Sequence, residues 1–125
     1  MNKKVIIIGG EGNGGVIAAC IEDNRKRFGD LEWQVAGFVN DFEKQVCGYP
    51  VLRNILTEQT FRKVNIPWER FATIVHKTAF IADSAVLEPG VFVMSNCYVG
   101  AQAHIGQCSL MMANSLIGHN THIGA

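Results

Sequence analysis

A run of glycines near the N-terminus stands where a backbone loop could bind a phosphate group. Gly10, Gly12 and Gly15 match the G-x-G-x-x-G fingerprint of dinucleotide-binding loops, and Gly9 and Gly14 add to the run. Glycines there let the backbone approach a phosphate at the N-terminus of the following helix. The motif indicates a phosphate-containing ligand. The alternative is a tight strand-to-helix turn that binds nothing.

An NAD site would need, in addition, an acidic residue that closes the second strand. Asp41 stands near that place, directly after Asn40. We therefore expect a nucleotide of some kind at the glycine run, with NAD as a less favoured form of it.

Histidine is the second residue type that could do chemistry, as a general base or a metal ligand. Four histidines lie in or near the second half of the chain: His76, His104, His119 and His122. His104 and His122 are 18 residues apart and, with Cys108, could suggest a metal site. No compact zinc spacing is present, so solvated strand residues are the favoured interpretation. His119 stands apart, directly after Gly118, and by itself is either a surface or a functional histidine.

A repeat of six residues must position these histidines. Every sixth residue from Val75 is aliphatic or Met, nine times in succession: Val75, Ile81, Leu87, Val93, Val99, Ile105, Met111, Ile117 and Ile123. The residue two places before each of these is never bulky, and Gly, Ala or Glu follows six of the nine.

This period predicts a parallel β-helix. Six residues make one short strand and a tight corner, and three such units close a triangular coil of 18 residues, with coils stacked about 4.8 Å apart. The aliphatic residues point inward, the small residues also face in near the corners, and the glycines serve the corner backbone. An antiparallel sheet would explain neither the spacing of six nor the small residues.

The first half has a different pattern, that of alternating strands and helices. We expect two strands and two helices, with one helix burying Val16, Ile17, Cys20 and Ile21: Lys4–Ile8 (strand), Val16–Arg27 (helix), Gln34–Val39 (strand) and Leu52–Val64 (helix). This β-α-β-α order is the start of a small doubly wound unit. Residues 65–68 are expected to form a hinge into the β-helix.

Composition narrows the class of protein. The chain has 125 residues, is 48% hydrophobic, and carries 11 basic and 11 acidic residues, for a net charge of zero. Neutrality gives no electrostatic case for a nucleic-acid or membrane partner. No apolar run is long enough for a membrane helix, and the N-terminus lacks a proper signal peptide, so we expect a cytoplasmic protein. Its four cysteines form no CxxC pair and are expected to be reduced thiols.

These features together resemble a known family. The segment Lys4–Gly14 is similar to the opening of the sugar O- and N-acetyltransferases of the sialic-acid O-acetyltransferase type, which include the bacillosamine and perosamine N-acetyltransferases. Phe71–His76 resembles the beginning of their left-handed β-helix, and Ile105–Gly124 continues it in register. The resemblance covers nearly the whole chain. It implies a Rossmann-like nucleotide-sugar-binding domain over residues 1–70 and a left-handed β-helix over residues 71–125.

The resemblance also implies site residues. The family's base histidine stands in an Ile-x-His-Asp/Glu segment, which matches Ile117 to Asn120, so His119 matches the base. Asn120 stands where the family has an acid that makes the histidine more basic. The family binds the nucleotide of its sugar substrate with the glycine loop and with acidic residues after the second strand. The matching positions here are Glu11, Gly12, Asn13, Asn40 and Asp41.

The chain departs from the family pattern in further ways. The family often has His where this chain has Asn13, and its third strand has no evident counterpart between Phe61 and Phe71. The repeat is still regular at Ala125, where relatives continue for several coils that carry most of the acetyl-CoA contacts. We therefore expect a truncated β-helix with an open end. No residue is assigned to acetyl-CoA, and residues 1–125 alone are expected to be inactive.

The resemblance implies an acetyltransferase that moves the acetyl group of acetyl-CoA to an amine or hydroxyl of a sugar, free or nucleotide-linked, without a metal. The family's site lies between subunits, which implies a homotrimer. A second hypothesis is a non-catalytic nucleotide-sugar-binding or assembly module, because Asn13, Asn40 and Asn120 replace functional side chains. A third is a zinc enzyme of the γ-carbonic-anhydrase type, which lacks the glycine-loop domain and whose histidine spacing is not matched here.

Overall fold

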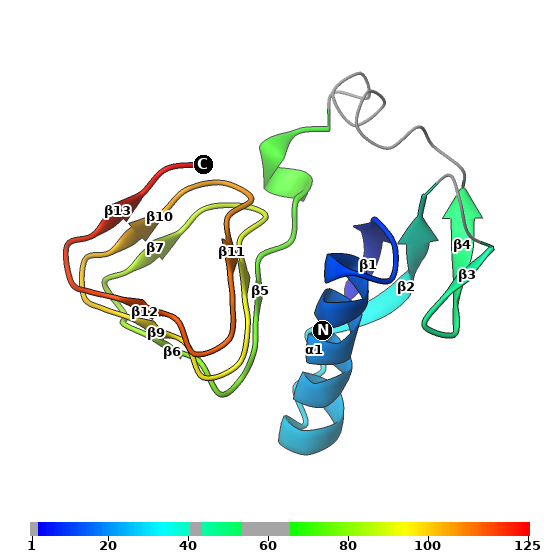
Figure 1. The fold of residues 1–125 in the computed structure, drawn as a ribbon, viewed down its shortest axis with the longest axis horizontal. Helices are drawn as coiled ribbons and strands as arrows, with labels where there is room; N and C mark the ends of the chain where they lie inside the picture. Colours follow the sequence, from blue (N-terminus) through cyan, green and yellow to red (C-terminus); the bar gives the residue numbers. More distant parts are fainter. Residues whose placement is uncertain (1–2, 41–43, 54–65) are drawn as a thin grey trace. The chain divides into compact units, whose positions relative to one another are not determined.

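The computed structural model describes residues 3–40, 44–53 and 66–125 (Figure 1). The chain divides into two compact units, Met1–Ile66 and Pro67–Ala125. The boundary therefore falls after residue 66 and not after residue 70, so the 3-10 helix Trp68–Arg70 belongs to the second unit. Within the described ranges, no helix is both long and apolar enough to cross a membrane.

The first unit begins with a strand-helix-strand crossover. Strand β1 (Lys3–Ile8) is followed by helix α1 (Asn13–Phe28) and strand β2 (Trp33–Val39), and β1 pairs with β2 in parallel. Ile7, Val35 and Phe38 are buried in the sheet. These elements confirm the first strand, the first helix and the second strand that the sequence predicts.

The buried face of α1 differs from the predicted one. Gly14, Ala18 and Ile21 are buried, at a spacing of four and three residues, whereas Val16 is exposed. Two of the three buried residues are small, so the helix backbone can lie close to the sheet. A count of apolar side chains overestimates Val16 because it ignores how Gly14 brings this turn of the helix against the strands.

The predicted second helix is wrong where it can be compared. Leu52 belongs to strand β4 (Tyr49–Arg53), which pairs with β2 in parallel and forms a hairpin with β3 (Gln45–Val46). The sheet order is β1-β2-β4-β3, so the third parallel strand comes earlier than residues 61–71. Residues 54–64 of the predicted helix lie outside the described residues.

Two backbone features produce this hairpin. Its two-residue turn is formed by Cys47 and Gly48, with φ of 50° and 81°. Two successive positive φ values define the turn that fits the twist of a hairpin. Gly37 on β2 allows β4 to lie beside it, because a Cβ there would lie 2.7 Å from the Leu52 side chain. The turn was missed because cysteine is not a usual first residue of this turn.

The second unit is a parallel β-helix, as the period of six predicts (Figure 1). Nine two-residue strands form three parallel sheets of three strands each, in the orders β5-β8-β11, β6-β9-β12 and β7-β10-β13. The strands are β5 (Ile74–Val75), β6 (Phe80–Ile81), β7 (Val86–Leu87), β8 (Phe92–Val93), β9 (Tyr98–Val99), β10 (His104–Ile105), β11 (Leu110–Met111), β12 (Leu116–Ile117) and β13 (His122–Ile123). Val86 pairs with His104 and His104 with His122, which is the predicted coil of 18 residues.

The prism of the β-helix is filled by the predicted positions. All nine aliphatic or Met positions belong to one core cluster, and Val93, Val99 and Ile105 are fully buried. Small residues two places earlier join the same cluster: Ala79, Ala85, Val91, Cys97 and Ala103. The inward direction of both registers is therefore confirmed.

The corners use a different device from the one predicted. Six corner residues, each six apart, have positive φ, and only one is glycine: Gly90, Asn96, Gln102, Cys108, Asn114 and Asn120. Gly100 and Gly106 are needed for a different reason, the close approach of the next coil. A Cβ at Gly100 would lie 2.7 Å from the backbone nitrogen of His119, and one at Gly106 would lie 2.6 Å from that of Ala125.

Candidate active site

The glycine run is anchored at the ends of β1 and β2. Gly9 has a φ of 144° and donates its N–H to the carbonyl oxygen of Val39 at 3.0 Å. The side chain of Asn40 is 2% exposed and donates from Nδ2 to the carbonyl oxygen of Gly9 at 3.2 Å. Asn40 therefore lies at the expected end of the second strand, where it fixes the glycine loop. Asp41 lies outside the described residues.

The remaining glycines of the loop serve two different purposes. A Cβ at Gly14 would lie 3.1 Å from the Phe38 ring, and one at Gly15 would lie 3.2 Å from Sγ of Cys47, so both positions allow close packing. A Cβ at Gly12 would meet nothing within 4 Å. Glu11, Gly12 and Asn13 are all exposed at the start of α1. The loop thus presents an open backbone surface at the helix N-terminus.

His119 lies at the corner between β12 and β13, and its side chain is exposed. Its Nδ1 lies 2.9 Å from Oδ1 of Asn120. A carbonyl oxygen only accepts hydrogen bonds, so Nδ1 carries the proton and donates it to Asn120. In the neutral ring, Nε2 then has a lone pair and can accept a proton. The arrangement is that of an oriented general base.

Asn120 is itself held by the preceding coil. Its Nδ2 donates to Oε1 of Gln102 at 2.6 Å, and its backbone N–H donates to the carbonyl oxygen of Ala101 at 2.9 Å. The backbone N–H of Gln102 in turn donates to Oγ of Ser84 at 3.0 Å. Ser84, Gln102 and Asn120 thus form a polar column along one corner of the β-helix. The sequence analysis missed Gln102, although its distance of 18 residues from Asn120 places it directly on the preceding coil.

His104 and His122 lie side by side on the sheet β7-β10-β13, as their spacing predicts. Their rings stack with centroids 4.6 Å apart and planes 6° from parallel. Nε2 of His104 lies 2.9 Å from Oε1 of Glu88, and the other carboxylate oxygen accepts the backbone N–H of Gln107 at 2.8 Å. The hydrogen bond with His104 holds the pKa of Glu88 below its usual value. Across the described part of the chain, no group of three or more His, Cys, Asp or Glu side chains could hold a metal ion.

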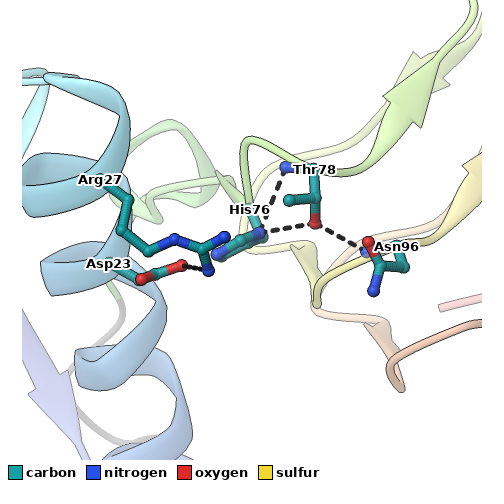
Figure 2. A network of polar contacts seen from close by, with 5 residues as sticks. All are labelled: Asp23, Arg27, His76, Thr78 and Asn96. Carbon is teal, nitrogen blue, oxygen red and sulfur yellow. Dashed lines mark hydrogen bonds and ion pairs between the residues drawn. The ribbon is translucent and has the colours of Figure 1, made fainter.

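The fourth histidine, His76, has contacts of a structural kind (Figure 2). It is 3% exposed, and its Nδ1 accepts the backbone N–H of Thr78 at 3.2 Å and lies 2.8 Å from Oγ1 of the same residue. Thr78 Oγ1 accepts the backbone N–H of Asn96 at 2.8 Å. This network joins two coils at one corner. Figure 2 also draws an ion pair within α1, between Asp23 and Arg27 at 3.1 Å.

No protein-family model matches the chain, and no curated protein matches its sequence at a significant level. Solved structures do match its fold. A histidine-to-alanine variant of GDP-perosamine N-acetyltransferase from Caulobacter crescentus, in complex with CoA and GDP-perosamine, is 23% identical with a TM-score of 0.75, and the match covers 98% of this chain and 66% of that one. The acetyltransferase domain of PglB from Neisseria gonorrhoeae FA1090, in complex with acetyl coenzyme A, is 19% identical with a TM-score of 0.75, over 100% of this chain and 69% of that one.

The chain thus spans about two thirds of the length of these proteins. At these identities the likeness establishes the fold, which is that of the sugar acetyltransferases with a parallel β-helix.

Proposed function

We propose that the protein is an acetyltransferase that moves the acetyl group of acetyl-CoA to an amine or hydroxyl of a nucleotide-linked sugar. The observation that carries the proposal is the geometry of His119, whose exposed ring has Nδ1 bound to Asn120 and Nε2 available as a base. The fold supports it, because proteins of this fold have been solved with CoA and GDP-perosamine or with acetyl coenzyme A.

In the proposed reaction, Nε2 of His119 takes a proton from the amine or hydroxyl of the sugar as that atom attacks the thioester carbonyl carbon. Acetyl-CoA supplies an activated acyl group. The tetrahedral intermediate collapses with cleavage of the carbon–sulfur bond, and the departing thiolate receives the proton from His119. Asn120 stabilises the charged ring through a carbonyl dipole, which is weaker than the carboxylate of the family. No nucleophilic side chain of the protein is needed, because transfer is direct.

The nucleotide of the sugar is proposed to bind the Rossmann-like first unit. The first N–H groups of a helix have no acceptor within the helix, so those of Asn13 and Gly14 can donate to a phosphate, which the helix dipole also favours. Glu11 and Asn13 provide exposed side chains around Gly12, and Asp41 is the proposed acidic partner after β2. Asn40 contributes by holding Gly9 in place.

We further infer a left-handed hand for the β-helix and a cytoplasmic homotrimer with its sites between subunits. These follow from the resemblance to the acetyltransferase family. Analytical ultracentrifugation tests the trimer directly, and a monomer at micromolar concentration would contradict it.

The activity is tested with the protein in its natural full length, acetyl-CoA and a panel of UDP-, CMP- and GDP-linked amino sugars. Release of free CoA thiol and a product heavier by one acetyl group are expected. His119→Ala should lower the rate on the order of 10²–10⁴-fold, which is the usual contribution of a general base. His104→Ala is the matched control, because it removes another partly exposed imidazole of the β-helix and should leave the rate within about twofold.

A second candidate is a non-catalytic nucleotide-sugar-binding module. The observation that favours it is Asn120, an amide where the family has a carboxylate. Binding of a nucleotide-sugar without release of CoA thiol, in wild type and His119→Ala alike, would establish this alternative and overturn the transferase.

A further inference from the structure

We propose that Gln102 is a positioning residue for His119, and that it acts through Asn120 by fixing which ring nitrogen of His119 carries the proton. The inference rests on the proposed role of His119 as the base. It starts from a chain of three side chains at one corner of the β-helix. Nδ1 of His119 lies 2.9 Å from Oδ1 of Asn120, and Nδ2 of Asn120 lies 2.6 Å from Oε1 of Gln102.

An amide beside a base histidine creates a difficulty that a carboxylate does not. Asp and Glu only accept hydrogen bonds, so they always receive the proton of Nδ1 and leave Nε2 free. Asn120 can turn its amide by 180° and present Nδ2 to the ring instead. The ring nitrogen facing it would then have to accept, so the neutral imidazole would carry its proton on Nε2. His119 could not take a proton at Nε2 in that state.

Gln102 provides the second contact that selects the productive orientation. Because Oε1 of Gln102 accepts from Nδ2 of Asn120, Oδ1 of Asn120 is left facing His119. Gln102 is also an amide, so the relay has two settings that differ by turning both side chains. The structure holds the setting in which the Gln102 oxygen accepts. A residue at position 102 that only accepts, or only donates, should therefore lock one setting.

The backbone of the corner makes this contact reproducible. Gln102 and Asn120 occupy the same corner on successive coils, with φ of 59° at both. The N–H of Gln102 is bound to Ser84, and the N–H of Asn120 is bound to Ala101. Neither backbone position depends on the side chain of residue 102. Substitutions there by other unbranched residues carry a similar cost for positive φ, so differences among them report hydrogen-bond chemistry.

The test compares Gln102→Glu, an acceptor, with Gln102→Lys, a donor. Long-range ¹H–¹⁵N NMR of histidine-labelled protein, at a pH of about 8 where imidazoles are mostly neutral, reports the tautomer of His119. Wild type and Gln102→Glu are expected to carry the proton on Nδ1, and Gln102→Lys on Nε2. A Gln102→Lys spectrum with the wild-type tautomer, or a wild-type protein with the proton on Nε2, would overturn the proposal.

Kinetics of the natural full-length protein provide the second readout. Gln102→Lys should lower kcat by about 10–100-fold, part of the contribution of a general base, with KM unchanged for both substrates. Gln102→Glu should keep the wild-type kcat or exceed it. Equal losses in both variants, matched by equal losses of thermal stability, would indicate a merely structural role and contradict the proposal. If wild type transfers no acetyl group at all, the proposed function fails, while the tautomer measurement still decides the relay.

Discussion

His104 and His122 stack face to face at the same place in successive coils, with ring centroids 4.6 Å apart. Glu88, on the strand that precedes both in the sheet, receives a hydrogen bond from the first of these rings. Three residues from three coils thus combine into one charged cluster on a face of the β-helix. The cluster lies on a different face from the strand β12 that leads into His119.

The first prediction concerns the pH dependence of stability at Glu88. The hydrogen bond with His104 lowers the pKa of this carboxyl in the folded state, and the charges of His104 and His122 add to the effect. A lowered pKa contributes stability that is present above the unfolded pKa and is lost as the pH falls through the folded pKa. Thermal midpoints measured from pH 7 down to about 3 should therefore fall less steeply for Glu88→Gln than for wild type.

Glu69→Gln is the control for this measurement, because Glu69 is an exposed glutamate on the 3-10 helix before the first coil. It should follow the wild-type curve. Identical acid profiles for Glu88→Gln and wild type would contradict the role of the Glu88–His104 pair.

The second prediction distinguishes two glycines of the loop. A side chain at Gly12 meets open space, so Gly12→Val should leave the first unit folded and block the approach of a phosphate to the backbone. Isothermal titration calorimetry with UDP-, CMP- and GDP-sugars should show loss of binding. Gly14→Ala should instead lower thermal stability, because its Cβ would press on Phe38. Wild-type affinity in Gly12→Val would remove the loop from the proposed site.

The third prediction concerns the support of the His119 corner by the preceding coil. Gly100→Ala places a Cβ 2.7 Å from the backbone nitrogen of His119. Overpacking of this kind should destabilise the β-helix by about 1–3 kcal/mol. Gly118→Ala is a matched control next to His119, because its Cβ would meet only Thr121, at 3.7 Å. Chemical denaturation should separate the two variants, and equal stabilities would show that the coils can move apart without cost.

The fourth prediction replaces the amide beside the base. Asn120→Asp provides a carboxylate that stabilises the charged imidazole more strongly than a carbonyl dipole does. We expect kcat to rise roughly tenfold, which corresponds to about 1.4 kcal/mol of transition-state stabilisation. The acidic limb of the pH–rate profile should move to higher pH. A lower kcat at every pH would mean that Asn120 is needed for its N–H donor, in which case the relay through Gln102 matters more than charge.

The sequence by itself determined the β-helix, because its evidence is periodic. Nine inward positions such as Val93, Val99 and Ile105 repeat without error, and any fold that buries them together must turn every six residues. The pairing of His104 with His122 follows from the same arithmetic. The glycine run likewise predicted where β1 ends and α1 begins, since local backbone requirements are written in local residues.

Only the tertiary structure decided the rest, because it depends on contacts between residues that are distant in sequence. Leu52 lies in a strand because β4 finds a parallel partner in β2 and Gly37 leaves room for it. Gly100 is required by the backbone of His119 on the next coil, which its own neighbours do not reveal. Gln102 meets Asn120 in the same way, across a coil and not along the chain. Hydrogen bonds of this kind depend on side-chain direction, which a period of six leaves open.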